Sequence, residues 1–376
     1  MSTFIQLHLL TSYPPSNLNR DDLGRPKTVV MGGRNRLRIS SQSLKRAWRT
    51  SDLIATAMNG HIGTRTKKIG KEMILAELPP DSPEAGHWAE DTLRVYGEPD
   101  EEPGTLSQLV FISPAEEAAL KDFTRAVKAF LSGSEDNGII KQVSLLHEER
   151  AKKNKEDERS KITKQIVSIL RKHLLIDKVT SAFDIAMFGR MLASSPGYDI
   201  EAAVQVAHAV TVHEAAVEDD YFTAVDDLNN GDENSGAAHI GETEFAAGLF
   251  YLYLCINRDL LVKNLGDDRD LAYRALSALT EVACKVAPTG KQNSFASRAY
   301  ASYLLAERGE QQPRSLSVAF LKPVRGEDIL AKAIAAIEET RSKMESIYGP
   351  CADNKKEMNA STGSGSLEEV IAFVKE

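Results

Sequence analysis

The chain has 376 residues and a formal net charge of −8, and its composition, 42% hydrophobic and 27% charged, is typical of a water-soluble globular protein. The longest apolar run, residues 246–256, is shorter than the roughly 20 residues of a membrane-spanning helix, and the apolar run at residues 4–10 is too short for a secretory signal. Three widely spaced cysteines argue against a disulfide framework and against a zinc site, so we expect a cytoplasmic protein.

Apolar and polar side chains alternate over residues 4–10, which predicts an opening strand. A basic block follows at residues 20–49. It contains nine Lys or Arg against two Asp, so it carries +7 while the rest of the chain carries −15. A positive block in a negative chain indicates one anionic partner bound at one place. Charge alone does not separate this from a solvated basic surface loop.

The order of residues within the block predicts an extended segment and then a helix. Three arginines alternate with other residues and would point to one side of an extended segment. They are Arg34, Arg36 and Arg38. Ser40 or Ser41 can cap a helix that we expect to run to about Met58. Four of its polar side chains stand at i, i+3, i+4 and i+7, which makes one continuous stripe. They are Gln42, Lys45, Arg46 and Arg49. Because a helix N-terminus attracts phosphate, we interpret the segment as a phosphate track.

The region from Asn59 to about Lys178 predicts a helical insertion. Helical patterns at residues 115–131 and 160–175 are joined by stretches that contain Pro and Gly. The run at residues 147–161 is nearly all charged, which is most often the solvated face of a helix.

Strands dominate the next part of the chain. We expect strands at residues 183–187 and 204–212, joined into a hairpin by a turn at 194–197. A longer hairpin should project from the body, with an extended segment at 221–228 and a polar tip at 229–236. The remaining patterns predict strands at 245–256 and 297–305, and helices at 268–286, 326–348 and 367–376.

Without the insertion and the long hairpin, the predicted order is strand, helix, strand, strand, helix, strand, with one additional strand. This α+β order is the ferredoxin-like plan that RNA-recognition domains share. The aromatic RNA-binding signature of that domain is absent from the sequence. Fold analogy alone therefore does not establish RNA binding.

The sequence offers no convincing catalytic or metal site. Residues 287–291 resemble a phosphate loop only in part, because Lys285 stands where the pattern requires Gly and Gln292 where it requires Ser or Thr. No G-x-S-x-G elbow occurs. His208 and His213 would lie on opposite faces of a strand, so they cannot share a metal ion. We expect no catalytic residue, no metal site and no cofactor.

Two large aromatic residues, Tyr221 and Phe222, stand at the base of the long hairpin and are followed by Thr223. They could anchor the hairpin to the core. Alternatively, one could wedge between nucleic-acid bases, since base–aromatic stacking tolerates any sequence.

Several stretches, in the same order along the chain, carry a family resemblance. They are NRDD at residues 19–22, MGGRNRLRISSQSLKRA at 31–47, FDIAMFGRM at 183–191, AHAVTVH at 207–213 and FTAVDDL at 222–228. Together they closely resemble the CasC family, the backbone subunit of the type I-E CRISPR surveillance complex Cascade. The resemblance is strong over the first fifty residues and over roughly 180–256, looser towards the C-terminus, and weak between about 55 and 175.

The resemblance implies a hand-shaped protein with a modified RNA-recognition palm, helical fingers and a hairpin thumb. The palm would comprise residues 1–58, 179–214 and, with C-terminal helices, 246–376; the fingers would be 59–178 and the thumb 215–245. The implied function is that of a non-catalytic subunit that polymerises head to tail along CRISPR guide RNA in antiviral defence. Its partners would be the guide RNA, further copies of itself, other Cascade subunits and, through the guide, target DNA.

The resemblance also implies roles for single residues. The positions that hold the guide backbone map to Lys27, Ser40, Gln42, Lys45, Arg46 and Arg49. Met191 stands where the family supports a kinked base, and Tyr221 stands where the family's thumb often begins with Trp. The predicted RNA-binding set is completed by Arg20, Arg34, Arg36, Arg38, Phe222 and Thr223.

Two other functional classes remain open at this point. One is a ribonuclease with a ferredoxin-like fold that processes or cleaves CRISPR RNA. It would need a catalytic group near the track, where Asp21 and Asp22 are the available carboxylates. The other is a metabolic enzyme that uses the basic loop to bind a phosphorylated small molecule.

Overall fold

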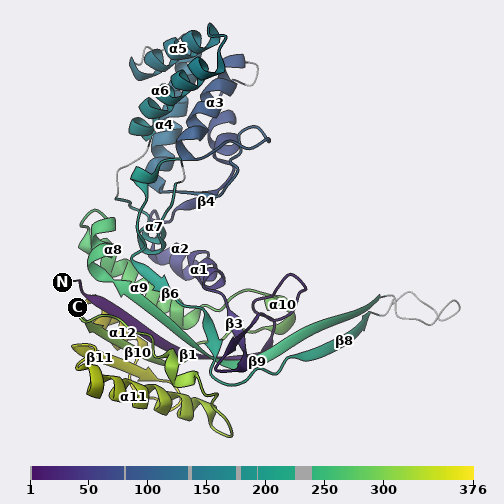
Figure 1. The fold of residues 1–376 in the computed structure, drawn as a ribbon, viewed down its shortest axis with the longest axis vertical. Helices are drawn as coiled ribbons and strands as arrows, with labels where there is room; N and C mark the ends of the chain where they lie inside the picture. Colours follow the sequence, from purple (N-terminus) through teal and green to yellow (C-terminus); the bar gives the residue numbers. More distant parts are fainter. Residues whose placement is uncertain (1, 80–81, 134–137, 175–178, 193, 225–238) are drawn as a thin grey trace, which may run out of the picture. The chain divides into compact units, whose positions relative to one another are not determined.

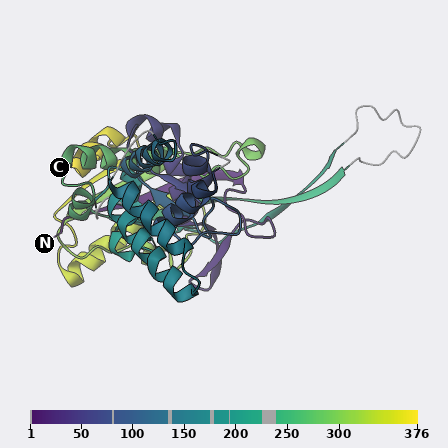
Figure 2. The ribbon, with the colours of Figure 1, turned by 90° about the horizontal axis from the view of Figure 1, so that it is seen from above.

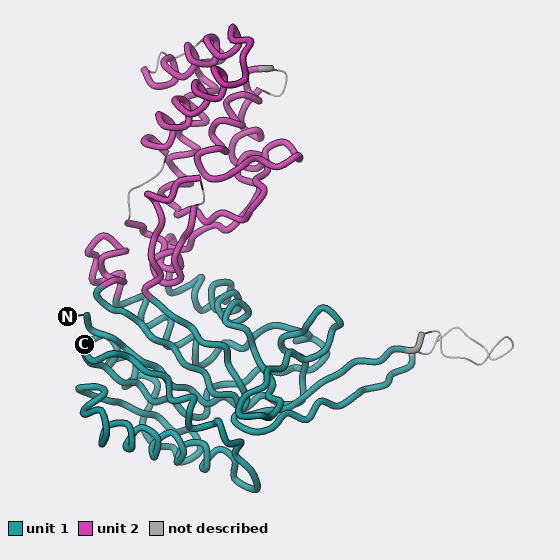
Figure 3. The backbone as a smooth tube through the Cα atoms, viewed as in Figure 1, with its two compact units in different colours: residues 1–57, 204–259, 273–376 teal, residues 58–203, 260–272 magenta. Residues whose placement is uncertain are grey.

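The computed structural model describes residues 2–79, 82–133, 138–174, 179–192, 194–224 and 239–376 (Figure 1). The chain divides into two compact units (Figure 3). Unit 1 contains residues 1–57, 204–259 and 273–376, and unit 2 contains residues 58–203 and 260–272. Among the described residues, no helix is long and apolar enough to cross a membrane.

Unit 1 is built on an antiparallel sheet with the spatial order β11-β10-β1-β9-β7-β3-β2. Its strands are β1 (Phe4–Ser16), β2 (Thr28–Met31), β3 (Arg34–Ile39), β7 (Ala209–Thr211), β9 (His239–Asn257), β10 (Ala301–Gly309) and β11 (Asn354–Asn359). Two further strands, β6 (Val204–Val206) and β8 (Glu218–Ala224), pair with β9. The predicted opening strand and the predicted strand at 245–256 are confirmed as parts of β1 and β9. The strand predicted at 297–305 begins later, as β10.

Helices cover the sheet of unit 1. They are α1 (Ser41–Arg49), α2 (Asp52–Ala57), α10 (Gln292–Phe295), α11 (Ile329–Tyr348), α12 (Leu367–Lys375) and the greater part of α9 (Arg269–Lys285). The residues of α8 (Arg258–Asn264) are divided between the two units. Ala333, Ile334 and Ile337 of α11 pack against Tyr251, Tyr303 and other buried residues of the sheet. Helices α1 and α9 lie on the side of the sheet away from α11 (Figure 1). The predicted helices at 268–286, 326–348 and 367–376 are confirmed to within a few residues.

The helix predicted from Ser41 to about Met58 is two helices. Helix α1 ends at Arg49, and α2 begins at Asp52. The Ser51 hydroxyl accepts a hydrogen bond from the Ile54 N–H (3.3 Å), so it caps the second helix in place of continuing the first.

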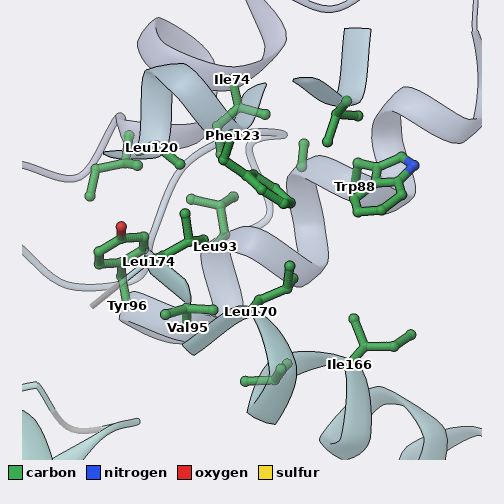
Figure 4. Close-up of a cluster of buried hydrophobic side chains, with 14 of the residues drawn as sticks. Ile74, Trp88, Leu93, Val95, Tyr96, Leu120, Phe123, Ile166, Leu170 and Leu174 are labelled. Atoms are coloured by element: carbon green, nitrogen blue, oxygen red, sulfur yellow. The ribbon is translucent and has the colours of Figure 1, made fainter. Parts of the chain in front are cut away.

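Unit 2 is mainly helical. Its elements are β4 (Thr64–Thr66), a π-helix (Gly70–Leu75), α3 (Pro83–Tyr96), β5 (Val110–Ile112), α4 (Pro114–Leu131), α5 (Gly138–Ala151), α6 (Glu156–Leu174) and α7 (Phe183–Phe188). Trp88, Leu120, Phe123 and Ile166 belong to its buried core (Figure 4). The helices predicted at 115–131 and 160–175 are confirmed as α4 and most of α6. The charged run at 147–161 is not one helix, because α5 ends at Ala151 and α6 begins at Glu156.

The strand predicted at residues 183–187 is wrong, because these residues form the helix α7. All five are buried, so the helix shows no exposed face and its sequence carries no helical period. The hairpin predicted with a turn at 194–197 is also wrong, since Pro196–Tyr198 forms a short 3-10 helix and β6 pairs with β9. The strand predicted at 204–212 is interrupted and forms β6 and β7. Unit 2 continues past residue 178, where we expected the palm to resume, because Ala182, Ile185 and Ile200 pack in a buried cluster within it.

The long hairpin is formed by β8 and the first part of β9. Its register runs from Glu218 opposite Phe245 to Ala224 opposite His239. The stem extends away from the rest of unit 1 (Figure 2). The tip predicted at 229–236 lies outside the described residues.

Candidate nucleic-acid interface

The basic stripe predicted on the first helix lies on the solvent side of α1. Leu44, Ala47 and Trp48 are buried on the opposite side, which fixes the rotation of the helix about its axis. Gln42 and Arg46 are exposed, and Lys45 and Arg49 are half-buried. Partial burial lowers the pKa of Lys45.

The first turn of α1 is held by three side chains. Ser40 is the N-cap, and its hydroxyl accepts the Ser43 N–H at 3.3 Å. The Ser40 N–H donates to the side-chain oxygen of Asn19 at 2.9 Å. The Ser41 N–H donates to Nδ1 of His208 at 2.9 Å.

His208 is a residue whose role the sequence did not reveal. Its pKa is lowered by burial first, and then by the positive charges of Arg38 and Lys27. Both effects favour the neutral ring, whose Nδ1 can accept the hydrogen bond from Ser41. From the sequence, we considered His208 only as a metal ligand. Its contact with Ser41 joins residues 167 positions apart in the chain, so no local sequence pattern reveals it.

The three alternating arginines of β3 have different environments. Arg34 is exposed, and its Nη1 lies 3.4 Å from Oε1 of Glu214. Arg38 is half-buried. Arg36 is 0% exposed, and its Nη1 and Nη2 donate to the backbone oxygens of Thr211 (3.0 Å) and Phe320 (2.9 Å). The prediction that Arg36 contacts RNA is therefore corrected: its guanidinium joins two segments of unit 1 below the surface.

The loop that precedes β2 is ordered by its own hydrogen bonds. Oδ1 of Asp21 accepts the N–H groups of Leu23 (3.0 Å) and Arg25 (2.9 Å). The Lys27 N–H donates to the Asn19 carbonyl at 2.8 Å. Lys27 is half-buried and Arg20 is exposed. The carboxylate of Asp21 thus shapes the turn that presents these cations.

A cleft of about 460 Å³ lies between this loop, α1 and a turn that follows α9. Its lining residues are Leu18, Asn19, Arg20, Asp21, Ser43, Arg46, Ala47, Thr50, Thr289 and Gly290. The fold therefore brings Arg20 and Arg46, two of the predicted site residues, to the same cavity.

The two aromatic residues of the hairpin stem differ in their surroundings. Phe222 is directly opposite Gly241, and a Cβ atom added to that glycine would lie 2.2 Å from the Phe222 ring. The ring therefore covers the glycine on one face of the hairpin. Tyr221 is opposite Glu242 on the other face and is 64% exposed, against 45% for Phe222. Thr223 is also exposed.

Acidic side chains surround these aromatics. The described residues of β8 include Glu218, Asp219 and Asp220, all exposed, and contain no Lys or Arg. Glu244 stands directly opposite Asp219 and is paired with Arg25, whose Nε lies 3.0 Å from Oε1 of Glu244. The stem therefore has a negative surface.

Met191 belongs to unit 2, whereas the other predicted site residues belong to unit 1. Its side chain is 76% exposed. The preceding residue, Arg190, is buried and ion-paired with Glu116. No group of three or more His, Cys, Asp or Glu that could hold a metal ion is found in the part of the chain that the structure describes.

Comparison with known proteins gives three findings. The family model described as "CT1975-like protein" matches residues 5–372. No curated protein matches the chain. Among solved structures, a chain of a "CRISPR RNA-guided surveillance complex, pre-nicking" is similar over 99% of both chains, with a TM-score of 0.77 and 27% identity. A chain of a "CRISPR RNA-guided surveillance complex" is similar in fold, with a TM-score of 0.57 and 23% identity over 99% of both chains.

Proposed function

The chain belongs to the CT1975-like protein family, and from this premise we propose that it is a component of a CRISPR RNA-guided surveillance complex of the Cascade type. Within that complex it would be the non-catalytic backbone subunit that binds guide RNA. The observation that carries the RNA-binding role is the stripe on α1, where Lys45, Arg46 and Arg49 lie opposite the buried face of the helix. The charges of Lys27 and Arg38 act on His208, which accepts a hydrogen bond from the first turn of the same helix.

Unit 1 is the palm in this proposal, and unit 2 is the fingers. In chain order, the elements β1, α1, β7, β9, α9 and β10 have the alternation of a ferredoxin-like domain. Strands β10, β1, β9 and β7 are neighbours in that order and are antiparallel. This arrangement supports a modified RNA-recognition palm, to which β2, β3 and β11 add edge strands.

The track would bind the sugar-phosphate backbone and leave the bases exposed. Guanidinium and ammonium groups contact phosphates whatever the base sequence, so specificity would come from base pairing between the guide and target DNA. Affinity should fall with salt, with a log–log slope of about −0.7 for each phosphate neutralised on a single strand. The negative charge of the remaining chain would discourage RNA from binding elsewhere.

The hairpin would act as a thumb on the RNA held by a neighbouring copy. Of its two aromatics, we assign the wedge between bases to Tyr221, because the Phe222 ring is already placed over Gly241. The carboxylates around Tyr221 repel phosphate, so the stem is suited to contact a base and unsuited to contact the backbone. Met191 would support the base that the wedge displaces.

Head-to-tail contacts between copies generate an open filament, whose length the guide and the end subunits would limit. The test is to purify the protein from cells that express CRISPR RNA. We expect RNA of one discrete length to co-purify with a multimer. A monomer that carries no RNA, and whose size in chromatography does not change when guide-length RNA is added, would contradict the proposal. If a nucleotide also raised the melting temperature of that monomer, the result would favour a metabolic enzyme that binds a phosphorylated small molecule.

A ribonuclease remains the alternative function, and Asp21 is its candidate catalytic residue, because it lines the cleft beside Arg20 and Arg46. The structure gives Asp21 a structural role, since Oδ1 accepts two backbone N–H groups. The protein should therefore leave repeat RNA and guide-complementary RNA intact, with and without Mg²⁺. Specific cuts that Asp21→Ala abolishes would assign the protein to that class.

A further inference from the structure

The turn at Thr289–Lys291 forms a wall of the cleft in front of α1, although the sequence pattern of a phosphate loop is incomplete there. Thr289 and Gly290 line the cleft on one side, while Ser43, Arg46, Ala47 and Thr50 of α1 line it on another. Residues that are far apart in the sequence thus converge on one cavity.

The turn is held firmly in place. A Cβ atom on Gly290 would lie 2.2 Å from the carbonyl oxygen of Leu18, so only glycine allows this approach to the loop after β1. Nζ of Lys291 donates to the Thr243 hydroxyl at 2.9 Å, which ties the turn to the base of the long hairpin. Lys291 and Ala296 have positive φ angles of 45° and 47°, a strained state that persists only where the surroundings enforce it.

The chemistry of the lining fits a ribose-phosphate backbone. Arg20 and Arg46 supply two guanidinium groups, and Ser43, Thr50 and Thr289 supply three hydroxyl groups. The Thr50 hydroxyl donates to the Arg46 carbonyl at 2.9 Å, so it can offer only an acceptor. The lining also holds the Asp21 carboxylate, whose Oδ1 accepts two backbone N–H groups and whose charge is outnumbered by the two guanidinium groups. Guanidinium groups bind phosphate, and hydroxyl groups can donate to phosphate or pair with a ribose hydroxyl. The described residues that line the cleft include no aromatic side chain on which a base could stack.

We propose that this cleft seats one ribose-phosphate unit of the bound RNA, with Thr289 as a binding residue on the wall opposite α1. The inference rests on the proposed function, and it adds a second side to the phosphate track. The RNA backbone would pass between α1 and the turn, and would not lie on the helix alone.

The experiment fills the cleft from its outer wall. Thr289 is exposed, so Thr289→Trp places an indole in the cavity without disturbing the core. Asn293 is also exposed and lies just beyond the same turn, but it does not line the cleft, so Asn293→Trp is the matched control. Affinity for an oligouridine is measured over a range of salt concentrations, and thermal melting checks that both variants fold like the wild type.

We expect Thr289→Trp to weaken binding and to reduce the magnitude of the log–log salt slope by about 0.7, the loss of one phosphate contact. Asn293→Trp should match the wild type. If wild-type protein binds the oligouridine and both variants bind it with the same affinity and slope, the cleft assignment is overturned while the proposed function stands. If wild-type protein does not bind RNA at all, both fail.

Photo-crosslinking gives a second measurement. The native residues Cys255, Cys284 and Cys351 are buried, so a thiol-reactive photo-crosslinker will label mainly an added cysteine. RNA should crosslink more efficiently to the labelled Thr289→Cys variant than to the labelled Asn293→Cys variant. Equal crosslinking at both positions would overturn the assignment.

Discussion

Arg190 and Glu116 form a buried ion pair in unit 2, in which Nη1 of the arginine lies 2.7 and 2.6 Å from the two carboxylate oxygens. Both side chains are 1% exposed. Glu116 also accepts hydrogen bonds from the N–H and hydroxyl of Ser113. The ion pair therefore connects the capping box of α4 to Arg190, the residue that precedes the exposed Met191.

Removing one partner of this pair should strongly destabilise unit 2. Arg190→Ala leaves a buried carboxylate without its cation, which typically lowers the free energy of unfolding by about 3 to 5 kcal/mol. Arg125→Ala is the control, because its pair with Asp122 is exposed and should contribute less than about 1 kcal/mol. A Trp48→Phe background leaves Trp88 of unit 2 as the fluorescent reporter during denaturation. Equal effects of the two arginine variants would contradict the prediction.

Neutralising the stripe on α1 should weaken RNA binding in the same way for every sequence. Lys45→Ala with Arg49→Ala removes two cations, so the magnitude of the log–log salt slope should fall by up to about 1.4 if each contacts one phosphate. Lys332→Ala with Lys343→Ala, on the exposed face of α11, removes the same charge elsewhere and should leave the slope unchanged. An equal loss in both double variants would indicate a general charge effect and no localised track.

Arg36→Ala should affect stability and not the RNA contact itself. The substitution leaves the backbone oxygens of Thr211 and Phe320 without their partner, and each unsatisfied buried group costs about 1 to 3 kcal/mol. Arg34→Ala, which breaks only the exposed pair with Glu214, should change the unfolding free energy by less than about 1 kcal/mol. Chemical denaturation provides the comparison. A smaller salt slope for folded Arg36→Ala protein would restore Arg36 to the interface.

Unit 1 should lose stability in acid through Glu307. Burial by itself would raise the pKa of this carboxyl, but hydrogen bonds from His8 and Arg314 outweigh burial and lower the pKa to about 2. Because the folded pKa of Glu307 lies below the usual value of 4.5, the interactions of its ionised carboxylate stabilise the protein above pH 4.5. That contribution, on the order of 3 kcal/mol, is lost as the pH falls towards 2.

His8 adds to the same trend, because burial lowers its pKa and the unfolded chain therefore takes up a proton that the folded chain does not. Urea denaturation at a series of pH values measures the effect. Glu307→Gln should flatten the acid side of the stability curve. An unchanged acid side in that variant would assign acid unfolding to other groups.

Single substitutions in the hairpin should separate its two aromatics. Tyr221→Ala should disturb the order of RNA-bound filaments in electron micrographs more than it changes the initial affinity for RNA. Phe222→Ala should expose Gly241 and loosen the stem, since the covering ring is removed. Hydrogen exchange of the stem amides should therefore rise in Phe222→Ala and stay near the wild-type rate in Tyr221→Ala. Regular filaments from the Tyr221→Ala variant would remove the proposed wedge.

Sequence patterns predicted the elements that have one buried face and one solvent face. Helix α1 is the clearest case, because its cap, its apolar side and its polar stripe are all local signals. Helix α7 was missed because burial on every side erases the period of 3.6 residues. Alternation placed Arg36 on a side of β3 but could not give its depth, which depends on Thr211 and Phe320. The contacts from His208 to Ser41 and from Phe222 to Gly241 depend on strand pairing and are invisible in a linear pattern.

Strand β9 runs without interruption from His239 to Asn257, so a single strand serves both the projecting stem and the centre of the sheet, where it pairs with β1. On this strand no loop separates the arm from the body, so its direction follows from the twist of the sheet itself. In a filament of the proposed kind, the twist of each subunit's sheet would then set the rotation and rise from one copy to the next. A substitution that changed this twist would change the pitch of the assembly.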